Sequence, residues 1–165
     1  MRTKTILGVL TALALAAATG AQTKLSGTAQ CGKPDPQHAI EVGDRPGHSF
    51  MVSQSKCTWT KPFEIEGVQA KDLVTTAFDE ITGDRSNTRG FFLNTMVNGD
   101  KNHGRYQGPA TLKGGAPQSV EGTWTFSGGT GKLKGLKGKG TYKGKGNPDG
   151  SLTYDVEGEY EVPKK

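Results

Sequence analysis

Apolar and polar residues alternate along most of the chain, and turn-forming residues interrupt this alternation at short intervals. An alternation with a period of two places successive side chains on opposite faces of a β-strand. The clearest case lies near the C-terminus, where the apolar residues of one face are Leu152, Tyr154, Val156, Tyr160 and Val162. The pattern predicts antiparallel strands, each with one buried and one solvated face.

Segments of this kind recur throughout the chain, and Trp59 and Trp124 within them are expected in the core. No helix long enough to cover an open sheet is expected. Closure of about eight strands would remove exposed strand edges, so we predict an all-β antiparallel barrel, with a two-sheet sandwich as the alternative. Strands are predicted at residues 23–30, 38–42, 48–60, 72–81, 88–97, 101–113 and 119–127, followed by a final hairpin that turns at 147–150.

The N-terminus departs from this pattern. The first four residues carry two positive charges, residues 6–18 form an uncharged apolar run, and small residues follow. This arrangement is typical of a secretory signal peptide, and the run is shorter than the roughly 20 residues of a spanning helix. We predict a signal peptide at 1–21, cleaved after Gly20 or Ala21, with a retained anchor as the alternative. A single barrel domain at 22–165 would then be exported, to the periplasm or the cell exterior.

Export changes the charge of the remaining protein. The formal net charge is +5, and loss of Arg2 and Lys4 with the signal leaves +3 (5 minus 2). A mildly basic chain without a clustered basic face does not indicate specific nucleic-acid binding. No segment after the signal is apolar enough over a sufficient length to be expected to cross a membrane.

The chain has two cysteines, Cys31 and Cys57. Paired thiols persist as disulfides in the oxidising compartments that exported proteins reach, so we predict a disulfide between them. A metal or redox pair is the alternative, although the spacing is not the CxxC of such sites.

The segment 128–146 contains six lysines and no acidic residue. Within it, Lys137, Lys139, Lys143 and Lys145 fall on one face of a predicted strand, and glycines with Tyr142 fall on the other. The segment lacks the Gly-Lys-Ser/Thr pattern of a phosphate-binding loop. Contact of the lysines with an anionic polymer is one interpretation. The preferred one is a solvated outer face, with inner glycines that permit curvature, close approach of a bulky neighbour, or space for a ligand.

Residues 124–142, with the sequence WTFSGGTGKLKGLKGKGTY, also carry a resemblance. The motif GTG-x-L-x-G-L-x-G-x-G resembles a hairpin of small exported bacterial proteins and of barrels of the allene oxide cyclase and dirigent type. The resemblance implies an eight-stranded antiparallel barrel with a cavity, often oligomeric. No catalytic residue of those proteins can be matched to a position in this sequence, and fold alone does not define function.

The best candidates for a polar ligand site are Arg89, His103, Arg105 and Tyr106, together with Arg85. These residues lie near two predicted turns, and we expect the turns to meet at one mouth of the barrel, where small-ligand sites often form.

Other possible chemistry is sparse. His38, His48 and His103 lack metal-ligand spacing and are expected to be solvent-exposed. Asp79 and Glu80 are adjacent and therefore point to opposite faces of a strand, which excludes an acid–base pair between them. No metal, cofactor or catalytic residue is assigned.

The sequence therefore predicts a non-catalytic protein that binds a small apolar ligand or has a structural role in the cell envelope. An enzyme of the isomerase or cyclase type that uses the barrel cavity is one alternative, and a lysine-mediated binder of anionic polymer is another. A homo-oligomer is an expectation from the resemblance alone.

Overall fold

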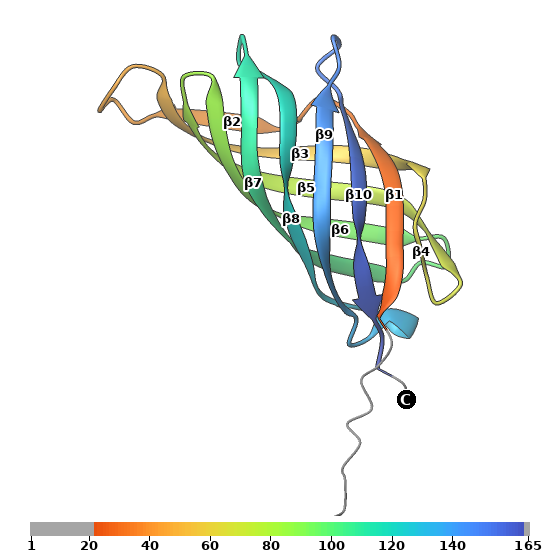
Figure 1. The fold of residues 1–165 in the computed structure, drawn as a ribbon. Coiled ribbons are helices and arrows are strands. Elements are labelled where there is room, and N and C mark those ends of the chain that lie inside the picture. Colours follow the sequence, from red (N-terminus) through yellow and green to blue (C-terminus); the bar gives the residue numbers. More distant parts are fainter. Residues whose placement is uncertain (1–21, 164–165) are drawn as a thin grey trace, which may run out of the picture.

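The computed structural model describes residues 22–163, which form ten strands and one 3₁₀ turn (Figure 1). The predicted signal peptide lies outside the described residues. Within them, no helix is long and apolar enough to cross a membrane. The elements in chain order are β1 (Thr23–Cys31), β2 (Gln37–Glu41), β3 (His48–Lys61), β4 (Glu64–Ile65), β5 (Val68–Thr82), β6 (Arg85–Met96), β7 (Lys101–Lys113), β8 (Ala116–Gly129), η1 (Gly131–Leu133), β9 (Lys137–Gly146) and β10 (Leu152–Glu161).

Eight of the strands close into an antiparallel barrel, in the order β1-β10-β9-β8-β7-β6-β5-β3 and back to β1. In Figure 1, β9, β10 and β1 run steeply across the front, and β3, β5 and β6 cross behind them. The short β2 pairs with β3 beyond the end of β1, and β4 pairs with the start of β5. The predicted all-β barrel is therefore confirmed, and the sandwich is excluded.

The predicted strand positions are largely confirmed. β5 begins at Val68, β6 at Arg85 and β8 at Ala116, so these three strands are longer than predicted. The two-residue β4 was not predicted, because it is too short to show an alternation and lies between Pro62 and Gly67.

The seam between β1 and β3 is the shortest junction of the closed barrel. β1 pairs with β10 along all of Thr23–Cys31, but with β3 only over Thr28–Cys31, where the register shifts once. Cys31 and Cys57 are cross-strand partners in this seam and form a disulfide. The predicted pairing of the cysteines is confirmed, and the bond fastens the seam that closes the barrel.

Aromatic rings from neighbouring strands lie directly over the glycines of the inner face. The lysines of β9 are exposed and its glycines face inward, as the sequence predicts. A Cβ atom built on Gly144 would lie 2.7 Å from the Tyr154 ring, and one on Gly140 would lie 2.5 Å from the Trp124 ring. Of the three roles considered for these glycines, the structure shows close approach of a bulky neighbour. The same arrangement joins further glycines to further rings: Gly90 to Tyr106, Gly104 to Phe92, and Gly138 to Phe126.

The exposed lysines of β9 lie beside a row of carboxylates. Across the sheet, Lys143 is opposite both Asp155 on β10 and Glu121 on β8. Lys139 is opposite Glu159, with 4.0 Å between the Nζ and Oε1 atoms. The positive charge of this face is therefore partly balanced by its own neighbours.

Replacement of both cysteines by serine should lower the free energy of unfolding by about 3 kcal/mol, because the disulfide no longer restricts the unfolded chain. Chemical denaturation of the Cys31→Ser/Cys57→Ser variant, beside the oxidised protein, measures this loss. An unchanged stability would show that strand pairing alone holds the β1–β3 seam.

Candidate functional site

The barrel encloses a cavity of about 90 Å³. Its wall is mainly aromatic, with only a few aliphatic and polar side chains. The aromatic residues that line it come from the strands and from the loop after β3: Trp59, Phe63, Phe92, Tyr106, Trp124, Phe126, Tyr142 and Tyr154.

The rings of this wall meet edge to face. Phe92 and Trp124 have centroids 6.5 Å apart and planes at 84°. The centroids of Tyr106 and Tyr142 lie 5.9 Å apart at 87°, and those of Tyr142 and Tyr154 lie 6.2 Å apart at 66°. Such contacts contribute roughly 0.5–1.5 kcal/mol each beyond area burial, so the rings support one another around the cavity.

One end of the barrel interior is filled by apolar side chains. Ile65 from β4, Met96 at the end of β6, and Leu133 and Leu136 around η1 are each at most 1% exposed. Above this plug, the backbone N–H of Glu66 donates to the Tyr160 hydroxyl at 3.4 Å. These side chains close this end of the barrel to a ligand.

A chain of buried amides lies between the plug and the cavity. The Trp59 indole N–H donates to the Asn94 Oδ1 atom at 2.9 Å, and the Asn94 amide donates to the Asn102 Oδ1 atom at 2.8 Å. The Asn102 amide in turn contacts the Met96 sulfur at 3.4 Å. Within the described residues no buried side-chain polar atom lacks a partner, so these amides serve to orient the indole.

A buried carboxyl, Asp79, lies on the inner face of β5. It accepts hydrogen bonds from the Ser86 hydroxyl at 3.1 Å and from the Thr88 hydroxyl. Burial raises the pKa of Asp79 above its ordinary value, and the two hydrogen bonds oppose this only in part. Asp79 is 8% exposed, whereas the adjacent Glu80 is exposed on the outer face, as strand alternation predicts.

Three tyrosines of the cavity wall belong to the same part of the interior as Asp79. Burial raises the pKa of the Tyr142 phenol to about 12, with a smaller contribution from the charge of Asp79. Burial likewise raises the pKa values of Tyr106 and Tyr154. All three phenols are therefore neutral near pH 7 and offer a ligand both donors and acceptors.

The residues proposed from sequence as a ligand site are divided between the two faces of the barrel wall. Tyr106 points into the barrel and lines the cavity, whereas Arg89, His103 and Arg105 are exposed on the outer face of β6 and β7. Arg85 is exposed as well. The reason is strand alternation, because Arg105 and Tyr106 are adjacent and must face opposite sides.

The structure adds polar interior residues that sequence reasoning missed: Thr75 lines the cavity, and Asp79 is buried on the same face of β5. Both alternate with Leu73 and Ala77 along β5 and therefore share one face of the strand. This alternation could have been used to predict that the Asp79 carboxyl points inward. The alternation of residues 152–162 correctly placed Tyr154 on the apolar face of its strand, but Tyr154 was not predicted to belong to a ligand site.

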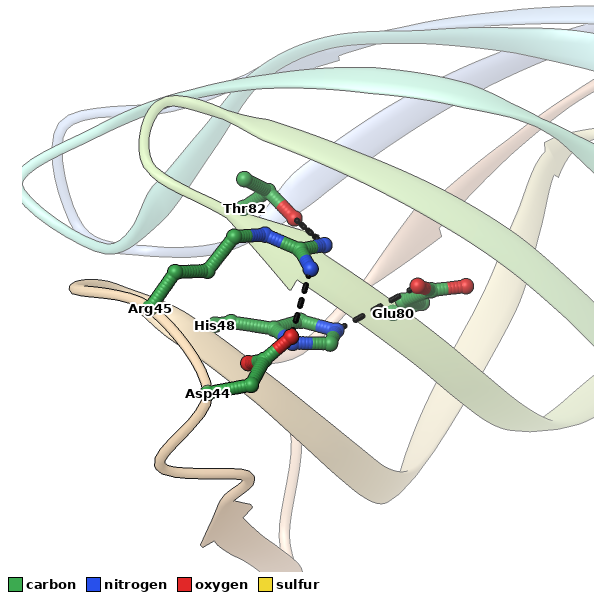
Figure 2. A network of polar contacts seen from close by, with 5 residues as sticks. All are labelled: Asp44, Arg45, His48, Glu80 and Thr82. Carbon is green, nitrogen blue, oxygen red and sulfur yellow. Dashed lines mark hydrogen bonds and ion pairs between the residues drawn. The ribbon is translucent and has the colours of Figure 1, made fainter.

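A second polar cluster lies outside the barrel, where the β2–β3 loop meets β5 (Figure 2). The His48 Nδ1 atom is 2.5 Å from Asp44, and the Nε2 atom is 3.3 Å from Glu80. Arg45 contacts Asp44 at 2.6 Å and the Thr82 hydroxyl at 3.4 Å. These contacts fasten the β2–β3 loop to β5.

The expected exposure of His48 is wrong, because the imidazole lies between two carboxylates and the residue is 6% exposed. His38 and His103 are exposed as expected. The hydrogen bond from His48 is the largest of the causes that hold the pKa of Asp44 below its ordinary value.

The chain matches no family model and no curated protein. Among solved structures it is similar to a pyocyanin demethylase, with 18% identity, a TM-score of 0.44, and coverage of 81% of this chain and 98% of that one. It is also similar to a pterocarpan synthase dirigent protein, with 12% identity, a TM-score of 0.48, and coverage of 87% and 88%. Likeness at this level does not bear on activity.

Replacement of Asp79 by asparagine should stabilise the protein at neutral pH. The folded-state pKa of Asp79 is raised, so folding favours its protonated form, and stability declines as the pH rises from the ordinary value of 3.8 through the folded-state value. Asparagine keeps an acceptor for Ser86 and Thr88 without the charge. Thermal unfolding of Asp79→Asn should show a gain near pH 7 that disappears below pH 3.8. An equal gain at both pH values would contradict the raised pKa.

Proposed function

We propose that this is an exported, non-catalytic protein that binds a small, flat, apolar ligand inside its barrel. The observation that carries the proposal is the cavity, because eight aromatic side chains line it, three of them phenols, and one carboxyl is buried in the neighbouring interior. Aromatic walls with a few polar groups are typical of small-molecule sites. The polar groups would orient the ligand, and the rings would stack against it.

The size of the cavity limits the ligand. An engineered apolar cavity of about 150 Å³ holds benzene, whereas this one measures about 90 Å³. A single six-membered ring would fit after small movements of the surrounding side chains. A long lipid chain would not fit, so the ligand class is a compact aromatic or cyclic molecule.

Export is supported by the Cys31–Cys57 disulfide and by the N-terminal sequence pattern. Disulfides persist in the periplasm and outside the cell and are rare in the cytosol. The sequence pattern of residues 1–21 is typical of the secretory signal that such a location requires.

An isomerase or cyclase is the second candidate, and Asp79 is the observation in its favour. A buried carboxyl whose pKa is raised can deliver a proton to a bound molecule. Chemical alteration of a ligand during incubation with the protein would favour this candidate, and recovery of the ligand unchanged would favour simple binding. The lysine-mediated alternative receives less support, because acidic neighbours partly balance the lysines of β9.

Titration with phenol or indole should shift the NMR signals of the Trp59 and Trp124 indole N–H groups, since both indoles line the cavity. Val156 offers matched variants because it also lines the cavity and can be changed in both directions. Val156→Ala enlarges the space and should strengthen binding, and Val156→Phe fills it and should abolish binding. Binding that is equal in both variants, or absent from the unmodified protein and from Val156→Ala, would refute the proposal.

A further inference from the structure

A band of exposed apolar side chains crosses the outer surface of β2, β3, β5 and β6, and we call it the outer band. Ile40 on β2 is opposite Phe50 on β3, and the next pair along is Val52 on β3 with Phe78 on β5. These strands are neighbours on the side of the barrel away from β9 and β10 (Figure 1). The members of the outer band are Ile40, Phe50, Val52, Phe78, Phe91 and Leu93.

The outer band is large for the free surface of a protein. Phe50, Phe78 and Phe91 are 49%, 41% and 52% exposed, so the three rings together expose roughly 300 Å² of apolar area. The three aliphatic members add to this area. The largest apolar patch of an ordinary monomer covers about 300–600 Å² and often has a function. The outer band therefore has the size of a surface that contacts something other than water.

Basic side chains border the outer band. Phe78 is opposite Arg89 on β6, and Phe91 is opposite Arg105 on β7. The Arg105 guanidinium carbon lies 5.6 Å from the centre of the Phe91 ring, so charge and apolar surface are in contact. Lys56 is exposed on the same outer face of β3. None of these three basic residues forms an ion pair with any residue in the described range 22–163.

The carboxylates near the outer band have basic partners of their own. Strands β3, β6 and β7 contain no acidic residue. On β5, Glu80 is opposite Phe50, and its Oε1 atom lies 3.3 Å from the His48 Nε2 atom (Figure 2). Asp72, farther along β5, lies 3.9 Å from the Lys71 amine. The charge left without a partner beside the band is therefore positive, unlike that of the β9 lysines, which lie among carboxylates.

Exposed rings and aliphatic side chains beside unpaired arginines are complementary to an anionic lipid surface. We propose that the outer band binds the surface of a bilayer that contains anionic lipids. The apolar side chains would enter the boundary between headgroups and acyl chains, and Arg89, Arg105 and Lys56 would contact the phosphates. The proposal does not rest on the proposed ligand site, because the band lies on the outer face of the barrel.

The composition of the outer band favours a bilayer over a single-stranded nucleic acid. Nucleic acids without secondary structure bind through bases stacked on aromatic side chains. Half of the outer band is aliphatic and has no ring for a base to stack on: Ile40, Val52 and Leu93. Acyl chains contact aliphatic and aromatic side chains alike.

Flotation with lipid vesicles measures the binding. The purified protein should float with vesicles of equal parts phosphatidylcholine and phosphatidylglycerol, and much less with phosphatidylcholine alone. Phe78→Thr and Phe91→Thr should each weaken binding to the mixed vesicles by about tenfold, because one ring no longer leaves water. Threonine is suited to strands, and thermal unfolding verifies that both variants remain folded. Residues 1–21 are the same in every variant, so they cannot cause a difference between them.

Charge variants distinguish this face from the overall charge of the protein. Arg89→Gln/Arg105→Gln should weaken binding to the mixed vesicles by roughly fivefold per arginine and have little effect with phosphatidylcholine alone. Lys139→Gln/Lys143→Gln is the matched control, because it removes the same charge from β9, which lies across the barrel from β5. This control should bind almost as well as the unmodified protein.

Three results would overturn the proposal: no flotation of the unmodified protein with the mixed vesicles, equal losses in the arginine and lysine variants, or full binding by both phenylalanine variants. Two other partners give different results. Oligothymidine bound in place of vesicles, and lost in Phe78→Thr, would assign the band to nucleic acid. An oligomer of the unmodified protein that Phe78→Thr dissociates, without vesicle binding, would assign it to a second copy. Either result would contradict binding to a bilayer.

Discussion

The placement of aromatic rings on glycine backbone is the constraint on which the interior of this barrel depends. Eight strands enclose little space, and large rings fit there only where the strand beneath them has no side chain. β9 shows this most clearly, since Gly140 lies under Trp124 and Gly144 under Tyr154. A glycine-rich strand is usually weak because it has little to pack. In this barrel its contacts are supplied by the rings of the neighbouring strands.

The same constraint defines the candidate site. Rings that rest on glycines lie against the barrel wall, and the space left between them is the cavity of about 90 Å³. Apolar side chains around β4 and η1 fill one end of the interior. The buried polar side chains of the candidate site lie toward the other end. Asp79 is buried there beside hydroxyl groups, with three phenols in the same part of the interior. A charge buried at a cost to stability is characteristic of sites retained for function.

Local alternation was sufficient to predict the barrel and the inward glycines of β9, because both depend on a period of two. The Cys31–Cys57 disulfide was predicted separately, from the chemistry of an oxidising compartment. Alternation was not sufficient for the site. Asp79 obtains its partners Ser86 and Thr88 through the β5–β6 register, and the three tyrosines meet only across different strands. His48 was misplaced for a similar reason, because Glu80 is 32 residues away in the sequence. The predicted grouping of Tyr106 with Arg105 was wrong because adjacent residues of a strand face opposite sides.

A double-mutant cycle at Gly144 and Tyr154 tests the packing of rings on glycine most directly. The atoms nearest to a Cβ at Gly144 belong to the side chains of Val120 and Tyr154, at 2.6 and 2.7 Å, and not to the backbone. Gly144→Ala should lower the free energy of unfolding by about 1–3 kcal/mol, and by clearly less in a Tyr154→Leu background. Gly32→Ala is the matched control, because its Cβ would lie 3.7 Å from the nearest atom, and it should cost little. Equal costs for Gly144→Ala in both backgrounds, or no cost beyond that of Gly32→Ala, would contradict the account.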